Sequence, residues 1–160
     1  MAKLTKKQVE ALLSAYEKEQ TDAANAAITA YDGVQDAQVA AVERETAADT
    51  RDVLADARRT LDDAAVKALI DRYAVRDAVA GLGLSRSGTA DTALATVEHT
   101  RRRTAAQAAV RQRTALSELS EKLVRARETA AAKKAQNAAA VRKNLASKLA
   151  EKRLSLGGKV

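Results

Sequence analysis

The sequence predicts an all-α fold, a long antiparallel helical hairpin with coiled-coil-like packing. Three observations indicate this fold. The 160 residues contain no proline, and most of the 46% hydrophobic content is alanine, the strongest helix former. Three of the six glycines fall within residues 81–88, near the middle of the chain. Apolar side chains recur every eleven residues on both sides of that stretch.

The alanine content limits how the hairpin can be stabilised. Alanine buries little apolar area per residue, so the chain cannot fill a thick globular core. We therefore expect a thin seam between helices that approach closely, completed by further copies of the chain.

The two halves of the chain carry opposite charge. Residues 1–80 contain 11 Lys or Arg and 15 Asp or Glu, whereas residues 81–160 contain 17 and 6. Folding at the centre places an acidic arm against a basic arm. Exposed ion pairs contribute only about 0–1 kcal/mol each, so this pattern favours the antiparallel arrangement without holding it together alone.

The first arm is expected over residues 1–80. Thr5 is a good N-cap, so the helix should begin near Lys6. Asp32-Gly33 is the one internal place for a kink or a break, although one glycine costs a long helix only about 1 kcal/mol. We expect the helix to continue through Gly33.

An eleven-residue period, 3.67 residues per turn, predicts a straight or slightly right-handed pair rather than a leucine zipper. In the first arm the period defines a seam of Tyr31, Val42, Val53, Ala64 and Val75. A neighbouring row contains Ile28, Val39, Thr50 and Leu61. Leu69, Ile70, Tyr73, Val75 and Val79 make the end of the arm its most apolar part.

A Gly/Ser hinge is expected over residues 81–91. Gly81, Gly83 and Gly88 can adopt the positive φ angles that end a helix. Ser87 and Thr89 offer side-chain oxygens that could cap the next helix.

The second arm is expected over 92–156, with a tail at 157–160. Its seam residues are Val97, Ala108, Leu119, Ala130 and Val141, with a companion row at Leu94, Ala105 and Leu116. The arm is basic, and the run Arg101, Arg102 and Arg103 follows Val97.

The sequence offers no pattern typical of catalysis, and we predict no catalytic, cofactor-binding or metal-binding residues. His99 is the only histidine, and there is no cysteine. Asp62 and Asp63 are adjacent on a helix and point to different faces. The glycines at 81–88 lack the Lys-Ser/Thr ending of a phosphate-binding loop and follow a helix rather than a strand.

The basic second arm is the one feature that suggests a ligand. Arg101, Arg102 and Arg103 could contact phosphates or an acidic protein surface. However, the chain has no aromatic side chains placed to stack on bases. No apolar run is long enough for an integral membrane segment.

Residues 73–80, Tyr-Ala-Val-Arg-Asp-Ala-Val-Ala, lead into Gly-Leu-Gly-Leu-Ser-Arg-Ser-Gly and then into an alanine-rich helix. This pattern resembles small alanine-rich helical virion proteins of bacteriophages, and in outline the inner-core proteins that are ejected with the genome. The resemblance covers most of the chain as a pattern, and residues 73–91 as a motif.

This resemblance implies a non-enzymatic structural protein that is made in the host cytoplasm and located in the virion. It implies assembly in multiple copies with other virion proteins, as an internal core, ejected, portal-associated or tail-associated component. The alternative is a basic helical protein that binds nucleic acid non-specifically. Copy number, symmetry and pairing of the arms within or between chains stay open.

Overall fold

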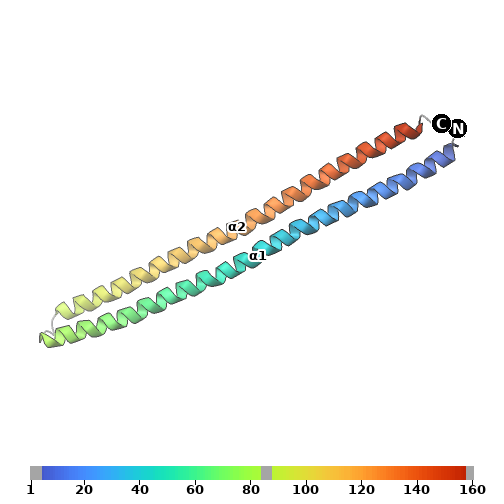
Figure 1. Cartoon of the computed structure of the whole chain (residues 1–160). Helices are drawn as coiled ribbons and strands as arrows, with labels where there is room; N and C mark the ends of the chain where they lie inside the picture. Colours follow the sequence, from blue (N-terminus) through green and yellow to red (C-terminus); the bar gives the residue numbers. More distant parts are fainter. Residues whose placement is uncertain (1–4, 84–87, 158–160) are drawn as a thin grey trace. The chain divides into compact units, whose positions relative to one another are not determined.

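The structure, a computed structural model, describes residues 5–83 and 88–157 and contains two helices. The first, α1, spans Lys6–Gly81, and the second, α2, spans Gly88–Gly157. The helices pack against each other as an all-α helical hairpin, which confirms the predicted fold class (Figure 1).

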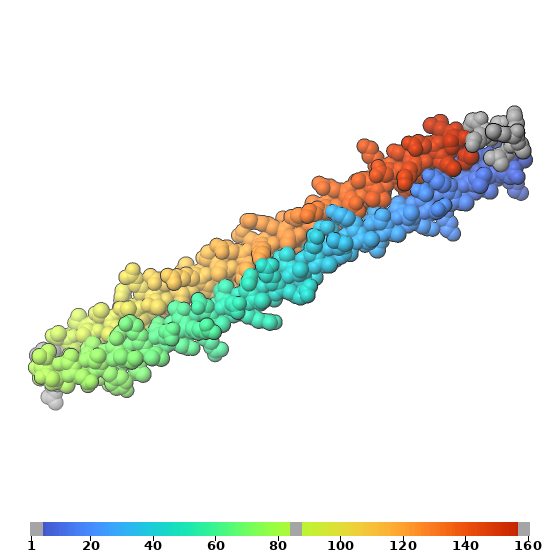
Figure 2. Space-filling model, viewed as in Figure 1, coloured from blue at the N-terminus to red at the C-terminus, as the bar shows by residue number. Residues whose placement is uncertain are grey.

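The chain divides into two compact units. The terminal unit combines α1 up to Glu43 with α2 from Leu123 onward, and the turn unit is Arg44–Lys122. Within the terminal unit the blue part of α1 lies beside the red part of α2, and within the turn unit green lies beside yellow (Figure 1). Atoms of the paired segments touch along each unit (Figure 2).

Helix α1 begins with a reciprocal cap. The backbone N–H of Gln8 donates to Oγ1 of Thr5 at 3.4 Å, and the backbone N–H of Thr5 donates to Oε1 of Gln8 at 2.9 Å. This arrangement satisfies two backbone donors that a helix start leaves free. The helix then continues through Gly33, where an added Cβ would meet no atom within 4 Å.

Of the central glycines that the structure describes, Gly83 is the one whose backbone conformation ends helix α1. Gly83 has a φ of 68°, and its N–H donates to the carbonyl of Ala80 at 3.1 Å. Gly81 is the last residue of α1 and Gly88 is the first of α2. Ser87, predicted as a hinge residue and cap, lies outside the described residues.

Helix α2 also begins earlier than position 92. Because its first residue is Gly88, Thr89 lies inside its first turn. The predicted role of Thr89 as N-cap is therefore wrong, since a capping residue precedes the first helical residue.

Ion pairs fix the antiparallel register in the terminal unit. Arg153 contacts Glu17 at 2.6 Å, Lys134 contacts Asp36 at 2.6 Å, and Arg127 contacts Glu43 at 2.7 Å. The residue numbers of the two partners add to the same total in all three pairs. Each step forward along α1 is therefore matched by an equal step backward along α2.

The predicted seam residues lie where α1 and α2 meet in each unit. Ala108 and Ala130 are buried. The remaining residues of these rows are half-buried: Tyr31, Val42, Val53, Ala64, Val75, Val97, Leu119 and Val141. The companion residues Ile28, Val39, Leu94, Ala105 and Leu116 are half-buried as well. Leu61 is 43% exposed, so its predicted place in the seam is wrong.

A second row, four residues after the first, carries some of the most buried side chains of the seam. Ala68 is 5% exposed, Gln35 5% and Thr46 6%. These residues repeat every eleven positions, and the row also contains the half-buried Leu13, Ala24, Ala57 and Val79. Positions i and i+4 lie on one helix face, so two such rows together make the contact surface of α1.

Candidate assembly surfaces

In the part of the turn unit between Ala57 and Tyr73, α1 directs alanines toward α2 and large apolar side chains away from it. The seam side contains Ala57, Ala64 and Ala68. The outer side contains four large residues that we call the outer stripe: Val66 (57% exposed), Leu69 (53%), Ile70 (61%) and Tyr73 (58%). Their spacing, i, i+3, i+4 and i+7, places them on one helix face.

The outer stripe has no counterpart of similar density among the described residues. The remaining large apolar side chains exposed there are spread over both helices, at Leu12, Val34, Leu54, Leu61, Leu82, Val110, Val124 and Leu154. Scattered apolar residues are normal on a protein surface, whereas four within two turns form a patch that is typical of an interaction site.

Charged contacts across the seam are exposed and individually weak. Arg127 donates from Nε and Nη2 to Oε1 of Glu43, at 3.3 and 2.7 Å. In the turn unit Arg72 lies 3.6 Å from Glu98. Such pairs contribute about 0–1 kcal/mol each, so their main effect is to select the register.

Lys122 makes a charged contact across the seam of the turn unit. Its ammonium donates to Oε1 of Glu45 at 2.9 Å. This hydrogen bond raises the pKa of Lys122 above its ordinary value, and the nearby carboxylates of Glu45 and Asp49 add to the effect. Both helices of the turn unit contribute to this contact.

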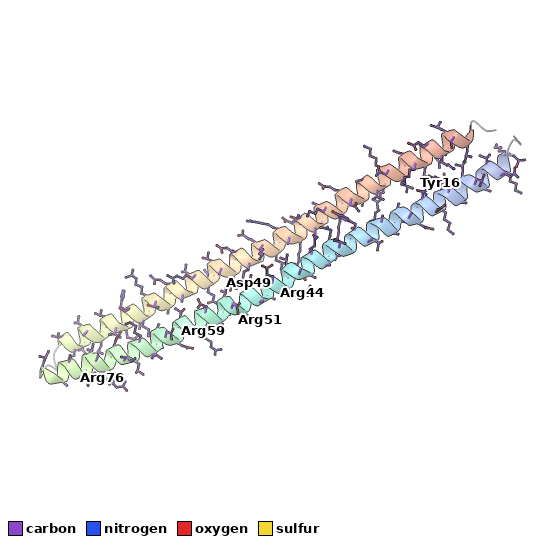
Figure 3. All side chains as sticks on the ribbon, in the orientation of Figure 1. Tyr16, Arg44, Asp49, Arg51, Arg59 and Arg76 are labelled. Carbon is purple, nitrogen blue, oxygen red and sulfur yellow. The ribbon has the colours of Figure 1, made fainter. Side chains whose placement is uncertain are left out.

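Tyr16 adds an aromatic contact to the terminal unit. Its side chain lies between the two helices (Figure 3), and Nζ of Lys152 lies 5.1 Å from the centre of its ring. A cation at this distance is attracted to the ring face. The contact adds to the ion pair of Glu17, the next residue, with Arg153.

Shallow grooves follow the seam of the turn unit. One, of about 270 Å³, is lined by Ala64 and Ala68 on α1 and by Val97 on α2. The next, of about 340 Å³, lies between Ala57 and Ala115. The grooves exist because the side chains along the seam are small. The rims of the grooves carry charged and threonine side chains rather than a convergent set of catalytic groups.

The predicted contact residues Arg101, Arg102 and Arg103 do not form one surface. Arg101 lies half-buried in the seam, and its Nε donates to Oε2 of Glu98 at 3.1 Å. Arg102 and Arg103 are exposed. Of the three side chains, only the latter two are fully available to phosphates or an acidic partner.

Other candidate groups are also placed by the structure. His99, Asp62 and Asp63 are exposed. Over the described residues, no group of three or more His, Cys, Asp or Glu side chains could hold a metal ion. Neither α1 nor α2, as far as each is described, has a segment long and apolar enough to cross a membrane.

The outer stripe and the second seam row were not predicted from the sequence. Leu69, Ile70 and Tyr73 were predicted only as part of the most apolar end of the first arm, without a side of the helix. Comparisons of the chain with known protein families, curated proteins and solved structures found no match.

Proposed function

We propose that this chain is a non-enzymatic structural protein of a bacteriophage particle, present in multiple copies. It assembles through helix–helix packing with other copies and other virion proteins, as an internal core, ejected, portal-associated or tail-associated component. The phage assignment rests on the resemblance of residues 73–91 to small virion proteins. The assembly role also has support from the surface of the turn unit.

The observation that carries the assembly role is the inverted arrangement of side chains in α1. Ala64 and Ala68 pack toward α2, while Leu69 and Ile70 face solvent. Fully burying a leucine or isoleucine side chain stabilises a structure by roughly 1.5–3 kcal/mol. A monomeric chain would be more stable with its large apolar side chains in the seam. A chain that joins an assembly can instead bury these side chains against its partners.

The test is to look for the chain in particles of the phage that encodes it. Antibodies against the purified protein should detect it in particles banded on a density gradient, at several copies per particle. An internal or ejected component should resist protease in intact particles and disappear after genome release. A chain that stays in the soluble lysate while particles form normally would contradict the proposal.

The second candidate, a protein that binds nucleic acid non-specifically, has one observation in its favour. Between Glu128 and Glu151, α2 carries five basic residues and no acidic one. Within the described residues, only Lys134 of these five forms an ion pair, so Lys133, Arg142, Lys143 and Lys148 are available to phosphates.

This candidate predicts a DNA affinity that falls steeply with salt. Replacing Lys133, Lys143 and Lys148 with glutamine should weaken binding and flatten the salt slope more than replacing Arg102 and Arg103 with glutamine. Binding that is equally tight at low and high salt, or absent at low salt, would rule out this alternative.

A further inference from the structure

We propose that the outer stripe is the centre of a two-fold symmetric contact in which α1 of one copy packs antiparallel to α1 of a second copy. The inference deepens the assembly role proposed above and rests on it. It concerns only the turn unit, and it follows from the apolar spacing of the stripe together with the charges at its two ends.

The stripe faces away from the seam and is not used within the turn unit. Val66, Leu69, Ile70 and Tyr73 are each more than half exposed. An apolar face with i, i+3, i+4 and i+7 anchors is the pattern that a helix offers to a partner helix. Four such side chains per copy bury less area than a standard stable interface, so the contact should be concentration-dependent.

Four exposed charges border the stripe. Arg59 and Asp62 precede it, and Arg76 and Asp77 follow it; Figure 3 labels the two arginines on α1. None of the four forms an ion pair within the described residues. Neighbouring charges are used on the inner side, since Arg72 pairs with Glu98, and Asp63 and Lys67 line a groove.

The helical positions of these four charges are self-complementary. Asp62 and Arg76 are fourteen residues apart, close to four turns, and they share one edge of the stripe. Arg59 and Asp77 are eighteen residues apart, five full turns, and they share the other edge. Each pair has opposite signs at its two ends, and both pairs are centred on the middle of the stripe.

A second copy in the antiparallel orientation therefore places Asp62 of each chain beside the partner's Arg76, and Arg59 beside the partner's Asp77. A parallel two-fold contact would bring opposite edges of the two stripes together, and it would set Asp62 three residues, about 4.5 Å, out of step with the partner's Arg59. The antiparallel orientation matches both charged pairs to within about one residue. Charge complementarity thus favours an isologous two-fold contact, in which the same patch serves both copies.

Cross-linking tests the orientation directly, because the chain has no cysteine of its own. Asp62→Cys and Arg76→Cys variants, with different tags, are treated with a short bis-maleimide separately and as a mixture. We expect the mixture to give the mixed 62–76 product and neither variant to link efficiently to itself. A mixture of Asp62→Cys with Ser147→Cys, an exposed position in the terminal unit, serves as the control. Self-linked products as the main species, or no product above the control, would overturn the proposal.

Charge exchange gives an independent readout in solution. Asp62→Arg and Arg76→Asp should each weaken self-association about tenfold in sedimentation velocity, because each variant places like charges together at two symmetric positions. An equimolar mixture of the two should associate again, since the mixed pair restores both attractions. Arg51→Glu, an exposed change away from the stripe, should leave association unchanged. A mixture no tighter than either variant alone would overturn the contact.

These experiments separate this contact from the proposed function. A chain found in phage particles without the 62–76 product would disprove the contact and leave the virion role intact. The 62–76 product in a chain absent from particles would support the contact and disprove the virion role.

Discussion

Arg153 of α2 donates hydrogen bonds from Nε and Nη2 to Oε1 of Glu17 on α1, at 3.0 and 2.6 Å. The two residues are far apart in sequence and lie in the same terminal unit. The contact shows how the acidic charge of the first arm and the basic charge of the second arm set the register between the two helices. An alanine-rich seam does not specify the register of two helices strongly, because one alanine packs much like the next. Charged side chains at the edges of the seam therefore have to select the register.

Exchanging the charges of this pair should preserve the stability of the fold better than reversing only one of them. We expect Glu17→Arg and Arg153→Glu each to lower the free energy of unfolding, and the double variant to recover part of the loss. The coupling should be about 0.2–1 kcal/mol because both side chains are substantially exposed. A double-mutant cycle from urea unfolding at low salt measures it. Zero coupling would show that the pair does not select the register.

The glycines should respond differently to alanine. Gly83→Ala should destabilise the chain by about 1 kcal/mol because its φ of 68° is strained for a residue with a side chain. Gly33→Ala should stabilise it by about 0.5–1 kcal/mol, since the position is helical and open. Thermal unfolding followed by circular dichroism distinguishes the two variants. Equal effects at the two positions would contradict the assignment of Gly83 as the residue that ends α1.

The second seam row can be tested by enlarging an alanine. Ala68→Leu should destabilise the turn unit by about 1–3 kcal/mol, although leucine is more hydrophobic, because Ala68 is 5% exposed and lies between the helices. Ala65→Leu is the matched control, since Ala65 is an exposed residue of the same helix. Chemical unfolding of both variants gives the comparison. A stabilising Ala68→Leu would mean that the added side chain enters the groove lined by Ala64 and does not push the helices apart.

The pH dependence of the Lys122–Glu45 contact has a defined sign. Because the folded state raises the pKa of Lys122 above 10.5, the pair stabilises the fold below that pH. The contribution is lost as the pH rises through the folded-state pKa. Glu45→Gln should lower the pKa of Lys122, and Asp49→Asn should lower it less. A ¹³C NMR titration of the Lys122 Cε signal measures both changes. An unchanged pKa in Glu45→Gln would contradict the hydrogen bond as its cause.

The helices and the first seam row could be predicted because the signals are strong. Proline is absent, alanine is abundant, and Val42, Val53 and Val97 stand out at eleven-residue intervals. The second row could not be found by hydropathy, since it contains Gln35, Thr46 and alanines. Its position follows only from geometry, because a helix in contact along its whole length needs a second row four residues after the first.

One error and one omission have physical causes. Leu61 continues the eleven-residue count of Ile28, Val39 and Thr50. In the structure this row moves back by one position to the half-buried Thr60, and Leu61 becomes exposed. The outer stripe was missed, because three of its residues were named only as part of the apolar end of the first arm. Hydropathy does not tell which of two apolar faces turns toward the partner helix, and in the turn unit Ala68 is buried whereas Leu69 and Ile70 are exposed.

The central claim is that this chain works by assembling with copies of itself. Sedimentation velocity with light scattering, over a range from micromolar to several hundred micromolar protein, tests it most directly. The account predicts a strongly helical chain whose average mass rises with concentration toward at least two chains, and whose association weakens in Leu69→Ser/Ile70→Ser. A helical monomer at every concentration would contradict self-assembly through the outer stripe.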